Sequence, residues 1–270
     1  MLLTITADDY GYDPGIDQGI HECLRCGGVD NVSISFGMDF SGLSSQYLDD
    51  LRRATVGIHW NLFPLEMDGT RISDLLRLIP ISLATRKRKD HMLGFLDRCL
   101  DRFARVGLHP LFFNGHQHVH LLPWWLDSLT DWGVSRGVTI FRQPSEAGKT
   151  AGVGRRERPE LLVLEFLGRL ARRRTRSKPI RWIPAVCRWG RTFELENLCG
   201  DLRNVDVPLI EGMVHPGMPT PDFERRTRWP LDQRKQLREL CRDDRESIFH
   251  RAGIRRLSLK TYLVQSHGIC

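Results

Sequence analysis

The sequence predicts an α/β fold in which parallel strands alternate with helices. Short apolar segments rich in β-branched residues alternate with amphipathic segments of helical period, and residues 1–62 follow the order strand–helix–strand–helix–strand. Polar residues stand at or near the ends of several expected strands, where proteins with parallel strands build their sites. The chain has 270 residues and shows no internal repeat or low-complexity linker. We therefore expect one domain, residues 1–270, of about six to eight βα units.

The first expected strand, 2–6, is an apolar run that leads into two adjacent carboxylates, Asp8 and Asp9. Aspartate is common in turns, so one interpretation of the pair is a turn cap. Successive side chains of a strand point to opposite faces, so the two carboxylates should not share one role. In the alternative interpretation, one of them holds a cation while the other faces a substrate or water.

The other elements follow from the same patterns. Strands are expected at 29–36, 56–62, 111–114, 138–141, 207–214 and 254–259. Helices are expected at 15–25, 45–53, 86–106, 124–132, 160–174 and 233–249. Asp13 and Pro14 have the pattern of an N-cap followed by the first helical residue, and Gly27 marks the end of that helix. The Gly-rich, basic stretch 147–159 is expected to be a loop, 66–83 is less regular, and 175–200 supports no assignment.

The formal net charge of +7 reflects an excess of arginine, most visible in the run 169–176. Basic runs bind nucleic acid or anionic lipid, and more often they are solvated surface. No nucleic-acid-binding motif accompanies this run, so nucleic acid is not an expected partner. No stretch approaches the ~18 apolar residues of a membrane span, and the N-terminus lacks the pattern of a signal peptide. A cytoplasmic location is the expectation.

Seven cysteines are scattered through the chain, and Cys23 and Cys26 form a C-x-x-C pair. No second pair follows at the spacing of a zinc site. Both residues fall near the end of the first expected helix, where residues three apart share a face. We expect them to be small packing residues rather than a metal or redox site, and free thiols agree with a cytosolic location.

Polar residues fall at or near the ends of the expected strands. They are Asp8, Asp9, His59, the histidines 116, 118 and 120, Arg142 and His215. Parallel strands bring these ends to one face. Two histidines and one carboxylate can bind Zn²⁺, Co²⁺ or Mn²⁺ and leave coordination positions open. Gly115 and Pro123 indicate that the chain turns within the histidine cluster, so His116, nearest the strand end, is the expected ligand.

Four segments of the chain stand out together. They are Thr6-Ala7-Asp8-Asp9-Tyr10-Gly11, Gly57-Ile58-His59-Trp60-Asn61-Leu62, Gly115-His116-Gln117-His118-Val119-His120 and Glu211-Gly212-Met213-Val214-His215-Pro216-Gly217. With these segments the sequence resembles the YdjC/ChbG-like carbohydrate deacetylases, a family related to polysaccharide deacetylases. The segments come in the family's order and at its usual spacing, and the stretch that begins at Arg142 agrees as well. The resemblance is weak in about 148–202, which is where substrate-selecting loops could differ.

The resemblance implies an incomplete or distorted (β/α) barrel that removes acetyl groups from N-acetylated amino sugars with one divalent metal ion. Matched position by position, Asp9, His59 and His116 are metal ligands, Asp8 is the base and His215 is the acid. Arg142, Tyr10 and Asn61 lie in the matching segments and are the expected substrate-binding residues. The ligand types suit Zn²⁺, and the resemblance also allows Mg²⁺. The family often has Asp-Ser where this chain has Asn114-Gly115, which removes a charge from the site.

Two other function classes remain as alternatives. One is a different barrel metallohydrolase such as a phosphoesterase, which would usually need a second metal site. The other is a non-catalytic basic binding protein that uses the arginine surface.

The helix 160–174 also has two interpretations. Its leucine stripe and cationic end suit peripheral contact with an anionic membrane, and hence a lipid-carried amino sugar, but the same stripe suits packing on a barrel.

Overall fold

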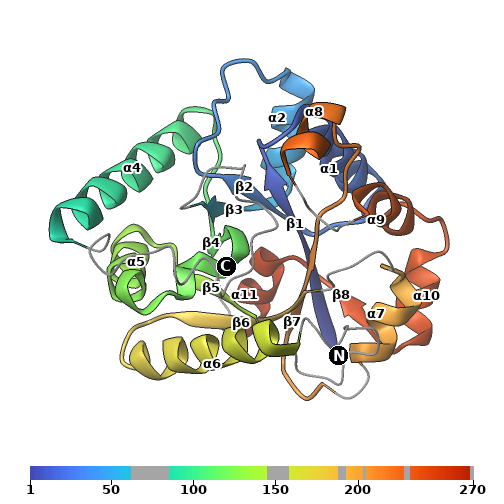
Figure 1. Ribbon diagram of the computed structural model, residues 1–270. Helices are drawn as coiled ribbons and strands as arrows, with labels where there is room; N and C mark the ends of the chain where they lie inside the picture. Colours follow the sequence, from blue (N-terminus) through green and yellow to red (C-terminus); the bar gives the residue numbers. More distant parts are fainter. Residues whose placement is uncertain (62–84, 145–157, 188–192, 203–204, 228–231, 268–270) are drawn as a thin grey trace.

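The structure is a computed structural model that describes residues 1–61, 85–144, 158–187, 193–202, 205–227 and 232–267. Its centre is a ring of parallel strands with helices around it (Figure 1). The strands are β1 Leu2–Tyr10, β2 Asn31–Ser35, β3 Thr55–Trp60, β4 Phe112–Gly115, β5 Ile140–Pro144, β6 Arg181–Cys187 and β7 Ile210–Val214. Because β1 pairs with both β2 and β7, these seven close into a barrel. The expected (β/α) barrel is confirmed, with one strand fewer than the usual eight.

Helices cover the outside of the barrel. They are α1 Pro14–Cys26, α2 Ser45–Arg53, α4 Arg86–Arg105, α5 Pro123–Arg136, α6 Arg158–Arg174, α7 Leu195–Leu202, α8 Pro221–Arg226, α9 Gln233–Leu240, α10 Arg245–Arg251 and α11 Leu259–His267. The predicted start of α1 is confirmed, because the Asp13 carboxylate accepts from the backbone N–H groups of Gly15 and Ile16. Gly27 ends α1 with a φ of 73°, in the left-handed region that favours glycine.

Strand β6 lies in the stretch that supported no assignment, because Pro184 in its middle argues against a central strand. Two expectations about elements are wrong. The helix expected at 233–249 is two helices, since α9 ends at Leu240 and α10 begins at Arg245. The strand expected at 254–259 is only β8, Arg255–Arg256, which pairs with the start of β1 before α11 begins. Helix α6 also starts inside the expected loop 147–159; residues 66–83 lie outside the described part of the chain.

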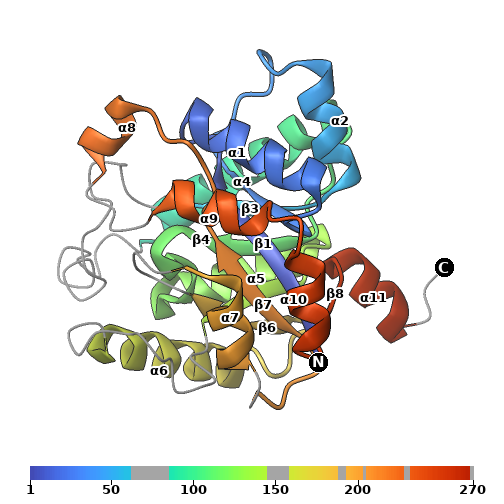
Figure 2. The same cartoon turned by 90° about the vertical axis from the view of Figure 1, so that its right-hand side faces the viewer.

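Side chains at the N-terminal ends of the strands form an apolar plug. Phe112 and Ile140, the first residues of β4 and β5, pack with Leu209 and with Leu259 of α11. Helix α11 and the N-terminus lie at this end of the barrel, and α8 lies toward the other (Figure 2). The N-terminal end is therefore closed by packing, which leaves polar chemistry to the C-terminal ends.

Candidate metal centre

The end of β1 carries the two adjacent aspartates, and both are buried. The backbone of Asp9 has a φ of 71°, which is uncommon for a residue other than glycine, and the pairing of β1 with β2 shifts register between Ala7 and Tyr10. This irregularity sends the two carboxylates to different partners, because Asp8 contacts Arg142 and Asp9 contacts His59 and His116. Backbone strain of this kind often marks a functional site.

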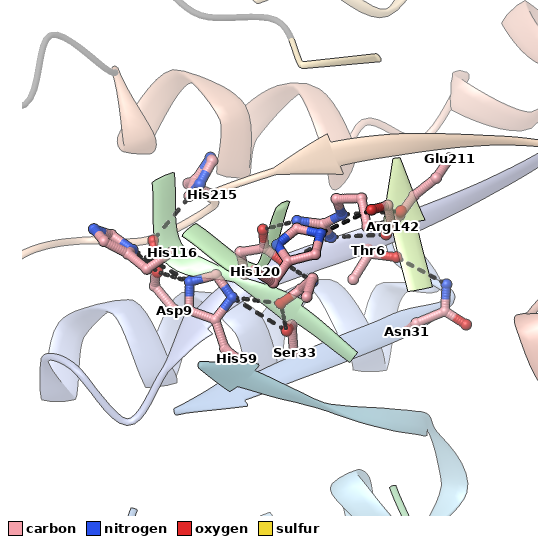
Figure 3. A network of polar contacts seen from close by, with 12 residues as sticks. Thr6, Asp9, Asn31, Ser33, His59, His116, His120, Arg142, Glu211 and His215 are labelled. Atoms are coloured by element: carbon pink, nitrogen blue, oxygen red, sulfur yellow. Dashed lines mark hydrogen bonds and ion pairs between the residues drawn. The ribbon is translucent and has the colours of Figure 1, made fainter. Parts of the chain in front are cut away.

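Asp9, His59 and His116 converge from three elements at the C-terminal end of the barrel (Figure 3). Asp9 Oδ1 lies 3.0 Å from His59 Nε2 and 3.2 Å from His116 Nδ1, and the two ring nitrogens are 3.2 Å apart. All three side chains are buried. Among the described residues, this is the one group of three side chains with suitable ligand atoms close enough to share a metal ion. A second metal site, as a two-metal phosphoesterase would need, is not found in that part of the chain.

Hydrogen bonds on the far side of His59 determine which of its nitrogens carries the proton. The Asn114 amide nitrogen donates to Asp8 Oδ1 over 3.3 Å, so its oxygen faces His59. That oxygen lies 2.7 Å from His59 Nδ1 and also accepts from Ser33 Oγ. An amide oxygen can only accept, so His59 Nδ1 carries a hydrogen. In its neutral form the ring directs the lone pair of Nε2 toward the Asp9 carboxylate.

These contacts fit a cation at the cluster. A lone pair that faces a carboxylate oxygen is repelled unless a proton or a cation lies between them. Asp9 Oδ2 is buried and has no hydrogen-bond partner among the described residues, which is costly unless something else binds it. Burial opposes ionisation of Asp9, but the close contacts with the His116 and His59 rings outweigh it and hold the pKa of the carboxyl well below its usual range. An ionised carboxylate beside imidazole nitrogens has the chemistry of a divalent metal site.

Asp8 belongs to a buried charged triad with Arg142 and Glu211. Arg142 Nη1 donates to Asp8 Oδ2 and Nη2 donates to Asp8 Oδ1, while Nη2 and Nε donate to Glu211. Burial raises the pKa of Asp8, and Arg142 more than reverses this, so the pKa stays below its usual value. Arg142 is only 2 % exposed and has a carboxylate on each side. The guanidinium is therefore engaged by two protein carboxylates, and it holds Asp8 in place.

His215 follows β7 and lies beside the group of Asp9, His59 and His116, called here the metal cluster, with Nε2 3.6 Å from Asp9 Oδ2. Its backbone N–H donates to the Gln236 side chain of α9 over 2.6 Å. Burial lowers the pKa of His215, and the carboxylates of Asp9 and Asp8 oppose that shift. His215 is thus placed to exchange a proton at the edge of the cluster.

The chain turns directly after His116, as Gly115 and Pro123 led us to expect. Gln117 and His118 have φ values of 49° and 58°, so the three histidines do not share one face. His120 Nε2 instead donates to the Arg142 carbonyl over 2.8 Å, and burial lowers the pKa of His120 to about 3. His118 is also buried, and burial lowers its pKa well below the usual range. Of the three, His116 alone belongs to the metal cluster.

Tyr10 does not join the site. Strand β1 continues through Tyr10, which is fully buried, and its hydroxyl lies 2.9 Å from His21 Nε2 in the core. Tyr12 borders the cluster instead, with its ring centroid 5.4 Å from that of His116 and 6.0 Å from that of His59. The alternation of side chains along a regular strand could not predict that Tyr12 and not Tyr10 borders the cluster, because the positive φ values of Asp9 and Gly11 interrupt that alternation. Asn61 follows β3 directly and is 8 % exposed.

Three further residues at the site had no role assigned from the sequence: Ser33, Asn114 and Glu211. Glu211 lies in one of the four segments that resemble the family and Asn114 lies next to another, so their positions in the sequence could have indicated a place in the site. Ser33 lies in β2 and has no local pattern that sets it apart from other strand residues.

Comparison with known proteins gives a consistent set of relatives. A family model described as YdjC-like protein matches residues 2–248. A carbohydrate deacetylase of Mus musculus is 28% identical over 249 residues, covering 82% of this chain and 79% of that protein. A carbohydrate deacetylase of Geobacillus stearothermophilus is 28% identical over 216 residues, covering 77% and 82%. The match to a carbohydrate deacetylase of Danio rerio, also 28% identical, spans 55% of this chain and only 51% of that protein.

A solved structure from Enterococcus faecalis shares the fold. It is described as a candidate cellobiose-phosphate cleavage protein, and it aligns with a TM-score of 0.61 over 97% of this chain and 98% of its own. The sequences are 14% identical, so this likeness supports the barrel and nothing further.

Proposed function

Because the chain belongs to the YdjC-like protein family, we propose that it is a metal-dependent hydrolase that removes the acetyl group from an N-acetylated amino sugar. The observation that carries the proposal is the buried set of Asp9, His59 and His116 at the C-terminal end of the barrel. The names of its relatives, which include a chitooligosaccharide deacetylase of Citrobacter koseri, support the substrate class.

We assign one divalent ion, Zn²⁺ or Mg²⁺, to Asp9, His59 and His116. The proton on His59 Nδ1, held by Asn114, leaves Nε2 able to bind a metal. When bound, such an ion polarises the amide carbonyl and makes a nearby water more acidic. Because Asn114 is neutral where the family often has aspartate, His59 Nδ1 donates its hydrogen bond to an uncharged acceptor.

Asp8 is the proposed base that takes a proton from the attacking water. Arg142 keeps its carboxylate ionised, so it is ready to accept a proton at neutral pH. A carboxylate of lowered pKa is a weak base. A water whose acidity is raised by a bound metal ion would give up its proton more readily and so offset that weakness. Glu211 stabilises the other side of Arg142, which keeps the guanidinium directed at Asp8.

His215 is the proposed acid that donates a proton to the leaving amine. An amine anion is a very poor leaving group, so this proton must arrive as the C–N bond breaks. The lowered pKa of His215 makes its protonated ring a stronger acid toward the amine. Gln236 fixes the backbone of His215 and so maintains its position beside the metal cluster.

Acetate release from a panel of N-acetylated amino sugars tests this function. We expect release from at least one chitooligosaccharide, monosaccharide or glycolipid, loss of that release with a chelator, and recovery on adding a divalent ion. Phosphate release from phosphate esters should stay at the background rate. Acetate release that survives exhaustive chelation would contradict the metal, and no acetate from any substrate by the metal-loaded protein would contradict the activity.

The location of the protein is a separate proposal. No helix in the described part of the chain is long and apolar enough to cross a membrane. Leu164, Leu167 and Ala171 of α6 are buried, as one interpretation of the leucine stripe required, and the last two pack with Leu121 and Leu126. The Leu161 side chain lies outside the described residues. A different face of α6 carries Leu162 and Phe166, 66% and 64% exposed.

We propose a cytoplasmic protein that touches an anionic membrane through this outer face of α6. Leu162 and Phe166 are one helical turn apart, and the exposed Arg169 and Arg173 continue the same face. Exposed apolar side chains beside cationic ones match the acyl and headgroup layers of an anionic bilayer. Such contact would suit a lipid-carried amino sugar as substrate.

We expect the protein to sediment with anionic vesicles and far less with neutral ones. The double variant Leu162→Gln/Phe166→Gln should lower vesicle binding by at least about tenfold, because each side chain contributes about 1.5–3 kcal/mol when fully buried. Val264→Gln on α11, where Val264 is 46% exposed, is the matched control and should bind as the wild type does. Equal, negligible binding to both vesicle types, with full activity on soluble sugars, would leave a soluble saccharide as the substrate.

A further inference from the structure

A cluster of three thiols lies on the outside of the barrel. Cys23 and Cys26 are on α1, and Cys241 is the C-terminal cap of α9, more than 200 residues later. Cys26 Sγ lies 2.7 Å from Cys241 Sγ, and Cys241 Sγ lies 3.9 Å from Cys23 Sγ. Cys23 is fully buried, whereas Cys26 and Cys241 are partly exposed. The expectation that Cys23 and Cys26 only pack did not include the third thiol.

The local backbone allows the ends of α1 and α9 to come this close. A Cβ atom at Gly28 would lie 2.6 Å from the Leu240 carbonyl oxygen and 3.2 Å from Cys26 Sγ, so only glycine fits there. Arg245 donates to the Cys26 carbonyl and places a positive charge at the C-terminal end of α1, against the negative end of the helix dipole.

We propose that Cys26 and Cys241 form a reversible disulfide, a site of thiol oxidation that joins α1 to α9. The two sulfur atoms are already within about 0.7 Å of the S–S bond length of about 2.05 Å. Both side chains reach solvent, so an oxidant can approach them.

The protonation states of the cluster favour Cys26 as the attacking thiolate. Hydrogen bonds with Cys23 and Cys241, together with the Gly28 N–H and the Arg245 charge, hold the pKa of the Cys26 thiol well below its usual range. The hydrogen bond with Cys241 and burial raise the pKa of Cys23 well above its usual range. A partly exposed thiolate next to a cation and a second thiol has the features of reactive cysteines.

Hydrogen peroxide is the oxidant that balances the reaction. The Cys26 thiolate attacks one peroxide oxygen, so an S–O bond forms, the O–O bond breaks and the leaving hydroxide becomes water. The Cys241 sulfur then attacks Cys26, the S–S bond forms and the hydroxyl leaves with the Cys241 proton as a second water. Two thiols and one peroxide give one disulfide and two waters, and a dithiol reductant reverses the change.

The two joined helices hold the His215 segment between them. On the α9 side, Gln236 accepts from His215 N–H and the Gln233 carbonyl accepts from Gly217 N–H. On the α1 side, the Gly15 carbonyl accepts from Met218 N–H over 2.9 Å, and the Asp13 carboxylate accepts from Thr220. A disulfide between α1 and α9 therefore stabilises the structure that positions His215, whether or not the deacetylase activity proposed above is correct.

The test treats the reduced full-length protein with a small excess of hydrogen peroxide, in the presence of chelator. We expect two free thiols to disappear, a proteolytic peptide that links Cys26 to Cys241, and recovery of both thiols with dithiothreitol. The link closes a loop of more than 200 residues, so the melting temperature of the oxidised protein should rise by on the order of 10 °C.

Variants distinguish this site from general oxidation. Cys26→Ser and Cys241→Ser should each abolish both the linked peptide and the rise in melting temperature, while the buried Cys99→Ser is the matched control and should retain them. A linked peptide that joins other cysteines, or no link with an unchanged melting temperature, would overturn the proposal. Because thiol counts and melting temperature need no substrate, failure here is distinct from failure of the deacetylase proposal.

Discussion

His59→Ala and His116→Ala are each expected to lose the bound metal ion and, with it, the hydrolytic activity. Each substitution removes one of three ligand atoms from a buried site, and the remaining two cannot hold the ion against water. Loss of an outer partner of a metal ligand already costs about 10–100-fold in metal affinity, so loss of a ligand should cost at least about 100-fold. Metal analysis of the purified variants and titration with Zn²⁺ measure the effect.

Two other histidines provide controls for these variants. His109→Ala removes an exposed side chain that is not part of the cluster, and it should bind metal as the wild type does. His118→Ala removes a buried neighbour of His116 that is outside the metal cluster, and it should also retain about one ion per chain. A folded His59→Ala or His116→Ala protein with a full equivalent of tightly bound metal would disprove the ligand assignment.

Asp8→Asn is expected to keep the metal and lose turnover by about 10²–10⁴-fold, the usual size of a general acid–base contribution. Asparagine has the shape of aspartate but cannot accept the proton of the attacking water. Arg142 keeps its contacts with Glu211, so the buried guanidinium is not left without a carboxylate. The metal content and kcat of the variant, measured together, test whether Asp8 serves the reaction or the ion.

His215→Ala should resemble Asp8→Asn, because His215 donates a proton and is not a proposed ligand. Asp101→Asn, an exposed position on α4, is the control for the aspartate change and should leave kcat unchanged. If Asp8→Asn or His215→Ala arrived without metal and recovered activity with excess ion, that residue would be a ligand instead of an acid or base.

Local patterns were enough to predict most of the barrel. Apolar β-branched runs located β1 to β5 and β7, and the helical period located α1, α2, α4, α5 and α6. The exceptions have local causes. Pro184 makes the sequence of β6 look unlike a central strand, yet β6 pairs with β5 on one side and with β7 on the other. Cys241 caps α9 and α10 begins at Arg245, so a long periodic stretch becomes two helices.

The sequence by itself determined the α/β class and most of the strands, and it placed polar residues at strand ends because each strand carries its polar residue at its own end. The resemblance to the family then singled out Asp9, His59 and His116 as the proposed ligands. The tertiary structure decided how those residues are used. Closing the ring of strands brings Arg142 between Asp8 and Glu211. The left-handed backbone at Asp9 places the Tyr12 ring, rather than the Tyr10 ring, beside the cluster. It also brings Cys26 to Cys241. These contacts join positions about 70 to 215 residues apart, or depend on one backbone angle, and periodicity along a segment carries neither kind of information.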